Sequence, residues 1–272
     1  MQTNPLLSCL ALRFNPLGDS GGEAIVSALE KNTHLTELDF SRCNIGDVTM
    51  KRFYTAISTI LQLSPHAEIY SDNESQTESK EPSLFTKKEE QAQKRFKFYY
   101  SRLEHMKQEV AESNAKSSHS HSVVSNFHHS PSSLALSNLR FENNNISSLG
   151  LFYLSSALFL ASLHSLMPLT TLTLHGNKNL TLTVEEEDST VTPTNSGSSH
   201  TSYSSSSILS LPPLLGINSL SLLLSSSSCV VSVLDLGDCA LGDNGVIALS
   251  SGLSSSTSLN SLNLEKYDIL YI

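Results

Sequence analysis

The 272-residue chain contains no tryptophan, and aromatic residues make up only 7% of it. Charged residues are also few, at 16%, and 17 basic against 26 acidic residues give a formal net charge of −9. This shortage of Lys and Arg argues against a nucleic-acid-binding protein, because such proteins usually carry a basic surface. Few aromatics combined with much serine indicate that part of the chain buries too little apolar surface to stay ordered.

Cysteine is scarce as well. No two of the four cysteines have the Cys-x-x-Cys spacing of metal and redox sites. Free thiols in a reducing compartment are the simplest interpretation. The N-terminal segment lacks the basic region of a signal peptide, and Asn4, Pro5 and Arg13 interrupt its apolar run. We therefore expect a cytoplasmic protein.

The motifs that carry most enzyme chemistry are missing. There is no phosphate-binding GxxxxGK[ST], no GxGxxG after a strand and no HExxH. The sequence Gly18-Asp19-Ser20-Gly21 resembles a hydrolase motif only superficially, because its copies at Gly46 and Gly242 lack the serine. The sequence thus predicts no catalytic residue, cofactor, metal ligand or small-molecule substrate.

Leucine and serine dominate instead, with 44 and 51 residues. The leucines follow a pattern, Leu7-x-x-Leu10-x-Leu12-x-x-Asn15-x-Leu17-Gly18-Asp19, that recurs 28 residues later. Apolar and small residues spaced by four follow the Gly-Asp pair and predict a helix. Each unit therefore consists of a strand, a loop and a helix. Complete, shortened or degenerate copies begin at Leu7, Leu35, Leu136, Leu169, Leu234 and Leu259.

This pattern resembles the leucine-rich repeat family, in particular the 28-residue type of ribonuclease inhibitor. The resemblance covers residues 5–62, 134–180 and about 208–272. It implies an α/β fold, a right-handed solenoid with a curved parallel sheet inside and helices outside. We expect the leucines to point inward, and an Asn or Cys to follow each strand. There, Asn satisfies backbone groups of the neighbouring turn and Cys packs as a small buried hydrophobe.

The repeats divide the chain into five segments. Residues 1–64 hold units 1 and 2, residues 134–180 hold the degenerate units 3 and 4, and residues 208–272 extend to a truncated C-terminal unit. A polar insertion (65–133) and a Ser/Thr-rich acidic insertion (181–207) separate them, and we expect most of both to be disordered. A second arrangement also stays open, in which the first insertion divides the repeat array into two weakly coupled blocks. No polar capping unit is visible at either end, which suggests a fragment or marginal stability.

Within the first insertion, an apolar stripe from Phe85 to Val110 predicts an amphipathic helix over about 84–113. It either binds a partner, calmodulin or a membrane surface, or docks on the protein's own solenoid or serves as a solvated spacer. Four histidines, His119, His121, His128 and His129, lie in a Ser-rich tract without a scaffold, so we expect no metal site there. In the second insertion, Ser189 and Thr190 adjoin an acidic run and are candidates for phosphorylation.

Residues 149–169 form an uncharged run of 21 residues, long enough to cross a membrane. The run contains four serines, a histidine and a proline, and no basic cluster flanks it. We therefore favour a buried repeat helix.

A solenoid of this type offers a rigid sheet surface to a partner. Side chains flanking the inward leucines should project from the concave face. Their mixture is polar and slightly acidic, so we expect a protein partner with a basic face. The predicted binding residues are Arg13, Glu37, Asp39, Ser41, Arg140, Glu142, Thr173, His175, Asp235, Asn263 and Glu265.

The first functional hypothesis is therefore a non-catalytic protein-protein interaction module. A second is a small-GTPase regulator, because Ran GTPase-activating proteins resemble this repeat type; Arg42 is the only arginine near a loop that we would test. A third is a membrane-associated repeat protein, through residues 149–169 or the 84–113 helix.

Overall fold

The computed structural model describes residue 4 and the ranges 6–62, 101–102, 104–112, 134–181 and 214–266. In these ranges every copy of the leucine pattern contributes a three-residue strand with leucine at its centre. The strands pair parallel, in chain order, into one six-stranded sheet. They are β1 (Cys9–Ala11), β2 (Glu37–Asp39), β3 (Asn138–Arg140), β4 (Thr171–Thr173), β5 (Val233–Asp235) and β6 (Ser261–Asn263).

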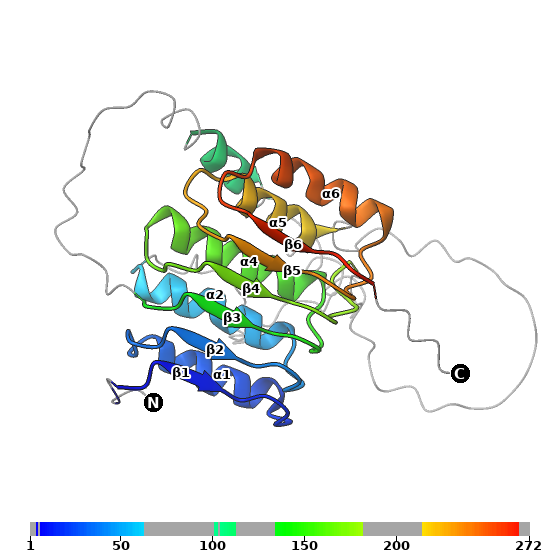
Figure 1. Ribbon diagram of the computed structural model, residues 1–272. Helices are drawn as coiled ribbons and strands as arrows, with labels where there is room; N and C mark the ends of the chain where they lie inside the picture. Colours follow the sequence, from blue (N-terminus) through cyan, green and yellow to red (C-terminus); the bar gives the residue numbers. More distant parts are fainter. Residues whose placement is uncertain are drawn as a thin grey trace, which may run out of the picture.

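A helix follows each of the first five strands and packs against the helices of the neighbouring units. All these helices lie on one side of the sheet (Figure 1). A strand and its helix form one unit, and unit 6 begins at β6. The described part of the chain is thus an α/β repeat solenoid, as the leucine pattern predicts. The helices are α1 (Gly18–Leu29), α2 (Asp47–Ile60), α4 (Ser148–Leu163), α5 (Leu215–Ser225) and α6 (Gly242–Ser255).

The central leucines of the strands are register partners of one another along the whole sheet. Because successive side chains of a strand point to opposite faces, these leucines all point to the helix side. Leu38, Leu139, Leu172 and Leu234 are at most 1% exposed there. Burial of each such side chain contributes about 1.5–3 kcal/mol to folding. This shared row explains why the leucine spacing alone predicts the unit.

The turn after each of the first five strands contains a residue with left-handed backbone. These are Phe14, Arg42, Asn143, Gly176 and Asp238, with φ between 51° and 74°. Their N–H groups donate to the next unit, as from Arg42 to the carbonyl of Glu142 at 2.8 Å. Gly176 has a second constraint, because a Cβ there would lie 2.5 Å from Oδ1 of Asn143.

Asn144, Cys43 and Cys239 act as predicted. Oδ1 of Asn144 accepts hydrogen bonds from the backbone N–H groups of Cys43 (3.1 Å) and Ile45 (3.2 Å) in the preceding unit. Cys43 is fully buried, and its Sγ donates to the carbonyl of Leu12 at 3.0 Å. Burial also raises the pKa of the Cys239 thiol to about 12. These cysteines are therefore structural rather than reactive.

The sheet continues across the first insertion. Strands β2 and β3 pair in register, and α2 packs against α4. The rings of Phe40 and Phe141 stack with centroids 6.0 Å apart, and those of Tyr54 and Tyr153 lie 6.1 Å apart. Units 2 and 3 are therefore in direct contact across the first insertion. The second insertion separates β4 from α5 and so lies inside unit 4.

The run 149–169 is not one long helix. Helix α4 ends at Leu163, and the chain then turns toward β4. Among the described residues, no helix has the length and apolar character needed to cross a membrane. In the predicted helix 84–113, residues 101–102 and 104–112 are helical, and the rest lies outside the described ranges. The four insertion histidines, Ser189 and Thr190 also lie outside them.

Candidate protein-binding face

The side of the sheet away from the helices, here called the open face, carries three rows of side chains. Two rows flank the central leucines within the strands, and the third lies two residues beyond the strand ends. Register pairing aligns each row across the six strands. The rows are Cys9, Glu37, Asn138, Thr171, Val233 and Ser261; Ala11, Asp39, Arg140, Thr173, Asp235 and Asn263; and Arg13, Ser41, Glu142, His175, Gly237 and Glu265.

Ion pairs connect neighbouring strands at the β1–β3 end of the open face. The guanidinium of Arg13 pairs with the carboxylate of Asp39. Nε of Arg140 lies 3.3 Å from Oε1 of Glu37. Because these pairs join side chains of different units, they hold the face in one arrangement. The Arg140–Glu37 pair is partly exposed, and such a pair adds only about 0–1 kcal/mol to stability.

Asp39 is a buried carboxylate beneath this network, 1% exposed. Its Oδ1 accepts a hydrogen bond from the backbone N–H of Ser41 at 2.9 Å. Burial raises the pKa of Asp39, but the backbone hydrogen bond from Ser41 and the guanidinium of Arg13 outweigh it, so its pKa lies below the ordinary value. Asp39 is therefore ionised and positions Arg13.

A second set of contacts lies on the β4–β6 part of the open face. Nδ1 of His175 lies 3.5 Å from Oδ1 of Asp235. Oδ1 of Asn263 accepts from the backbone N–H of Glu265 at 2.9 Å. Gly237 leaves room for the side chains of His175 and Asn263, because a Cβ at position 237 would lie 2.6 Å from Nδ1 of His175 and 2.9 Å from Nδ2 of Asn263.

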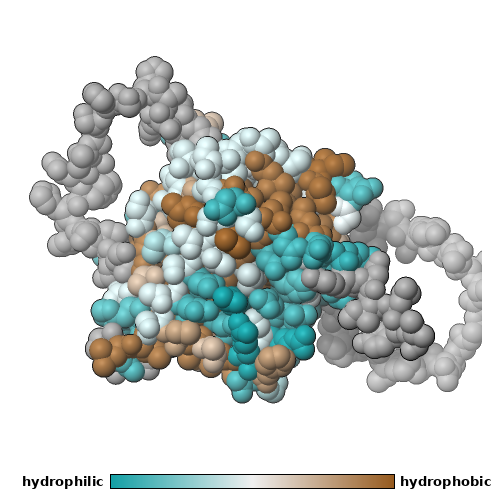
Figure 2. Space-filling model, in the orientation of Figure 1, coloured by the Kyte–Doolittle hydropathy of each residue, from teal (hydrophilic) through white to brown (hydrophobic). Residues whose placement is uncertain are grey.

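Not every predicted binding residue is available to a partner. Asp39, Ser41 and Thr173 are 1%, 4% and 8% exposed, so neighbouring side chains cover them. The other eight keep at least partial exposure: Arg13, Glu37, Arg140, Glu142, His175, Asp235, Asn263 and Glu265. Figure 2 shows hydrophilic side chains across the middle of the molecule and apolar ones toward both the β1 end and the α6 end.

The sequence interpretation missed most of the first row. It named Glu37 but not Cys9, Asn138 or Ser261, because it took the third leucine of each copy as the centre of the strand. The strands are centred on the leucine two residues before it. Applying the alternation of side-chain directions to that leucine would have identified this row. It also missed that the Arg42 guanidinium stacks over the Phe14 ring, 5.1 Å from its centroid, just beyond the strand ends.

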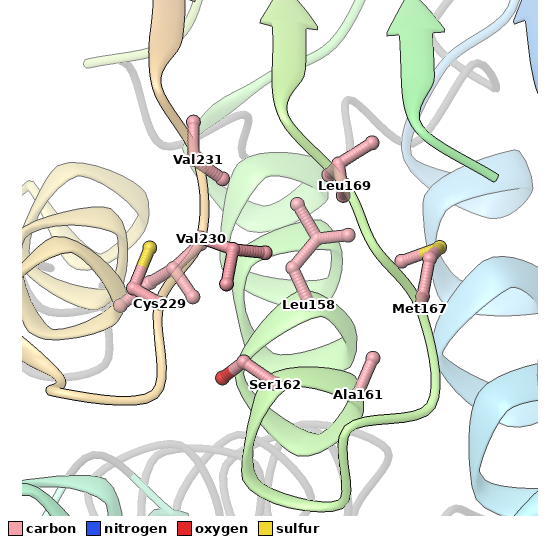
Figure 3. Close-up of a pocket in the computed structure, with 9 residues that line it drawn as sticks. Leu158, Ala161, Ser162, Met167, Leu169, Cys229, Val230 and Val231 are labelled. Carbon is pink, nitrogen blue, oxygen red and sulfur yellow. The ribbon is translucent and has the colours of Figure 1, made fainter. Parts of the chain in front are cut away.

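No pocket of ligand size accompanies this face among those found in the described part of the chain. An apolar pocket lies instead between the end of α4 and the segments that lead into β4 and β5 (Figure 3). Leu158, Met167, Cys229 and Val231 are among its lining residues. Its cavity of about 10 Å³ admits one water-sized group at most. Such a pocket suits no cofactor or small substrate.

Metal-binding side chains are not grouped in the described ranges, where no three His, Cys, Asp or Glu residues gather. The open face presents carboxylates, guanidinium groups and hydroxyls on a sheet of fixed register.

Comparison with known proteins agrees with the repeat pattern. Residues 3–26, 31–51 and 227–250 match the family described as Leucine Rich repeat. The matches fall on units 1, 2 and 5 and support a leucine-rich repeat protein. No curated protein matches the chain significantly.

Proposed function

Since the chain carries leucine-rich repeats, we propose that it is a non-catalytic module that binds a protein partner on the open face. Leucine-rich repeat domains generally mediate protein–protein interaction. The 28-residue spacing supports the ribonuclease-inhibitor-like subfamily, and with it a right-handed solenoid whose open face is concave. The four cysteines are all free thiols, which fits a reducing compartment such as the cytoplasm.

The observation that carries the proposal is the charge of the open face. Its rows contain five carboxylates, Glu37, Asp39, Glu142, Asp235 and Glu265, against two guanidinium groups, Arg13 and Arg140. Both arginines already pair with carboxylates of the face. The remaining negative charge favours a partner that presents Lys or Arg side chains.

A photo-crosslinking experiment tests the proposal. A benzoylphenylalanine replaces Ser261 on the open face or, as matched control, Ser250 on α6; both are exposed serines. We expect a discrete crosslinked partner from position 261 only. Glu142→Lys should lower the yield at least tenfold, whereas Glu23→Lys on α1 should not. Equal adducts from both positions, unaffected by Glu142→Lys, would contradict binding at the open face.

Two further assays separate the alternative functions. A small-GTPase regulator requires the chain to accelerate GTP hydrolysis, and Arg42→Ala would remove that effect. An interaction module leaves GTP hydrolysis unchanged. A membrane-associated protein requires pelleting with phospholipid vesicles, which Glu142→Lys would not reduce.

A further inference from the structure

Helix α4 is buried around almost its whole circumference. Of its 16 residues, 13 are buried. In α2, which also lies between two other helices, only six of 14 residues are buried. The helices of neighbouring units, α2 and α5, cover two sides of α4. A helix in the outer layer of a solenoid would otherwise expose its outward side, so another segment must cover it.

The covering segment belongs to the first insertion. Met106 and Val110 lie four residues apart on one side of the helical residues 104–112 and are 0% and 9% exposed. Both belong to the main apolar core. The hydroxyl of Ser156, on α4, lies 3.6 Å from Sδ of Met106. The predicted amphipathic helix therefore docks, in its described part, on the protein's own solenoid.

The fit of this cover is incomplete. Nε and Nη2 of Arg102 and Oε2 of Glu109 are buried without a hydrogen-bond partner, while the other carboxylate oxygen of Glu109, Oε1, lies 3.2 Å from Nδ1 of His105. Buried polar atoms without hydrogen-bond partners oppose docking, whereas burial of Met106 and Val110 favours it. On the exposed side of the same segment, by contrast, charged side chains pair with each other: Nζ of Lys107 lies 2.6 Å from Oε1 of Glu104.

We propose that the helical segment 101–112 is a displaceable cover of α4, and that an amphipathic helix of a protein partner takes its place. The segment that now covers α4 defines the chemistry of that partner, because its Met106 and Val110 stand at positions i and i+4. The partner is therefore a helix with apolar side chains at this spacing. A partner helix without charged groups at the positions of Arg102 and Glu109 binds the same surface with fewer unpaired atoms. This surface lies on the helix side of the sheet and is separate from the open face.

Hydrogen exchange on the unaltered full-length chain is the first test. A displaceable cover opens while the repeats stay folded. We expect the amides of residues 104–112 to exchange at least tenfold faster than those in the middle of α4. Equal protection of the two helices would overturn the proposal, because the cover would then open only with the core.

Peptide binding is the second test. The probe is a fluorescent 101–112 peptide, stapled between positions 107 and 111. The double variant Met106→Lys/Val110→Lys should release the cover from α4. The control variant is Gln108→Lys/Ala111→Lys, which changes two exposed positions. The released chain should bind the probe at least tenfold more tightly than the control variant does. A probe with Arg102→Ala and Glu109→Ala should bind the unaltered chain at least tenfold more tightly than the unmodified probe.

Three outcomes would overturn the proposal. One is a released chain that does not bind the probe. Another is a released chain that pellets with phosphatidylserine vesicles but ignores the probe, which would make a membrane the occupant. The third is loss of the folded repeats on release, measured by circular dichroism, because a displaceable cover leaves them intact.

Discussion

At the scale of single residues, Asp39 shows how a charged group becomes part of the framework of the open face. Its side chain is buried, yet it keeps its charge because Ser41 and Arg13 supply hydrogen bonds and an opposite charge. Without Asp39, the Arg13 side chain would lose the group that positions it. Residues of this kind shape a binding surface without touching the partner.

Asp39→Asn should lower the free energy of unfolding by about 1–3 kcal/mol at pH 7, because a charge-assisted interaction is lost. The folded-state pKa of Asp39 is lowered, so its stabilisation is present above the ordinary value of about 3.9 and disappears as pH falls through the folded-state pKa. The difference between the two proteins should therefore shrink below about pH 4.

Urea denaturation from pH 7 to pH 2.5 measures this difference. Asp243→Asn, at an exposed position on α6, is the control and should stay within about 0.5 kcal/mol throughout. A constant deficit for Asp39→Asn at every pH would show that packing, not charge, is responsible.

At the scale of elements, hydrogen bonds between units hold the turns and helix starts in register. Oδ1 of Asp19 accepts from the backbone N–H groups of Gly46 (2.8 Å) and Thr49 (3.1 Å) where α2 begins. Asp47 accepts in the same way from Ser147, where α4 begins. Each unit thus satisfies donors at the start of the next helix, which explains the recurrence of aspartate after the glycine.

Asn144→Ala should destabilise the protein by about 2–4 kcal/mol, because it removes bonds to two units at once. Oδ1 of Asn144 accepts from the preceding unit, and its Nδ2 donates to the carbonyls of Phe40 (2.9 Å) and Phe141 (3.0 Å). Asn15→Ala is the matched control, since Nδ2 of Asn15 donates only within its own unit, at 2.9 Å to Leu12.

We expect a loss of no more than about 1 kcal/mol for Asn15→Ala. Chemical denaturation of both variants measures the contrast. Equal losses would mean that the contacts within a unit, rather than those between units, account for the asparagine.

At the scale of the whole molecule, stability depends on stacking of units that are distant in the sequence. Leu38 of β2 and Leu139 of β3 are register partners although 101 positions separate them. Nearest-neighbour stacking makes a repeat array one folded body as long as adjacent units touch. The insertion interrupts the chain but not the stack.

Cleavage of the chain between residues 122 and 123, at an introduced site for a specific protease, should therefore leave the two fragments associated. We expect them to co-elute in gel filtration and to unfold in one transition. Leu139→Asp should separate them, because it places a charge in the shared core row. Separation of the fragments without that substitution would contradict a continuous stack.

Most of the repeat architecture could be predicted from the sequence, and much less of the binding face. The strand, turn and helix of a unit depend on residues at most about 28 positions apart. Their places in the sequence are indicated directly by the leucines, by the Asn or Cys after the strand and by the Gly-Asp pair. The open face depends on side-chain contacts between units. Thus the ion pair between Arg13 and Asp39 and the burial of Asp39, Ser41 and Thr173 were not foreseen.

The sequence by itself determined the repeating unit, because each leucine must be buried wherever the strand places it. The tertiary structure decided how the units and insertions fit together. The apolar stripe of the first insertion was compatible with a partner, a membrane or its own solenoid, and only the contact of Met106 with Ser156, fifty positions away, selected the solenoid. The physical reason is that apolar periodicity specifies that a face is buried, whereas the surface that buries it depends on which chain segments meet in space.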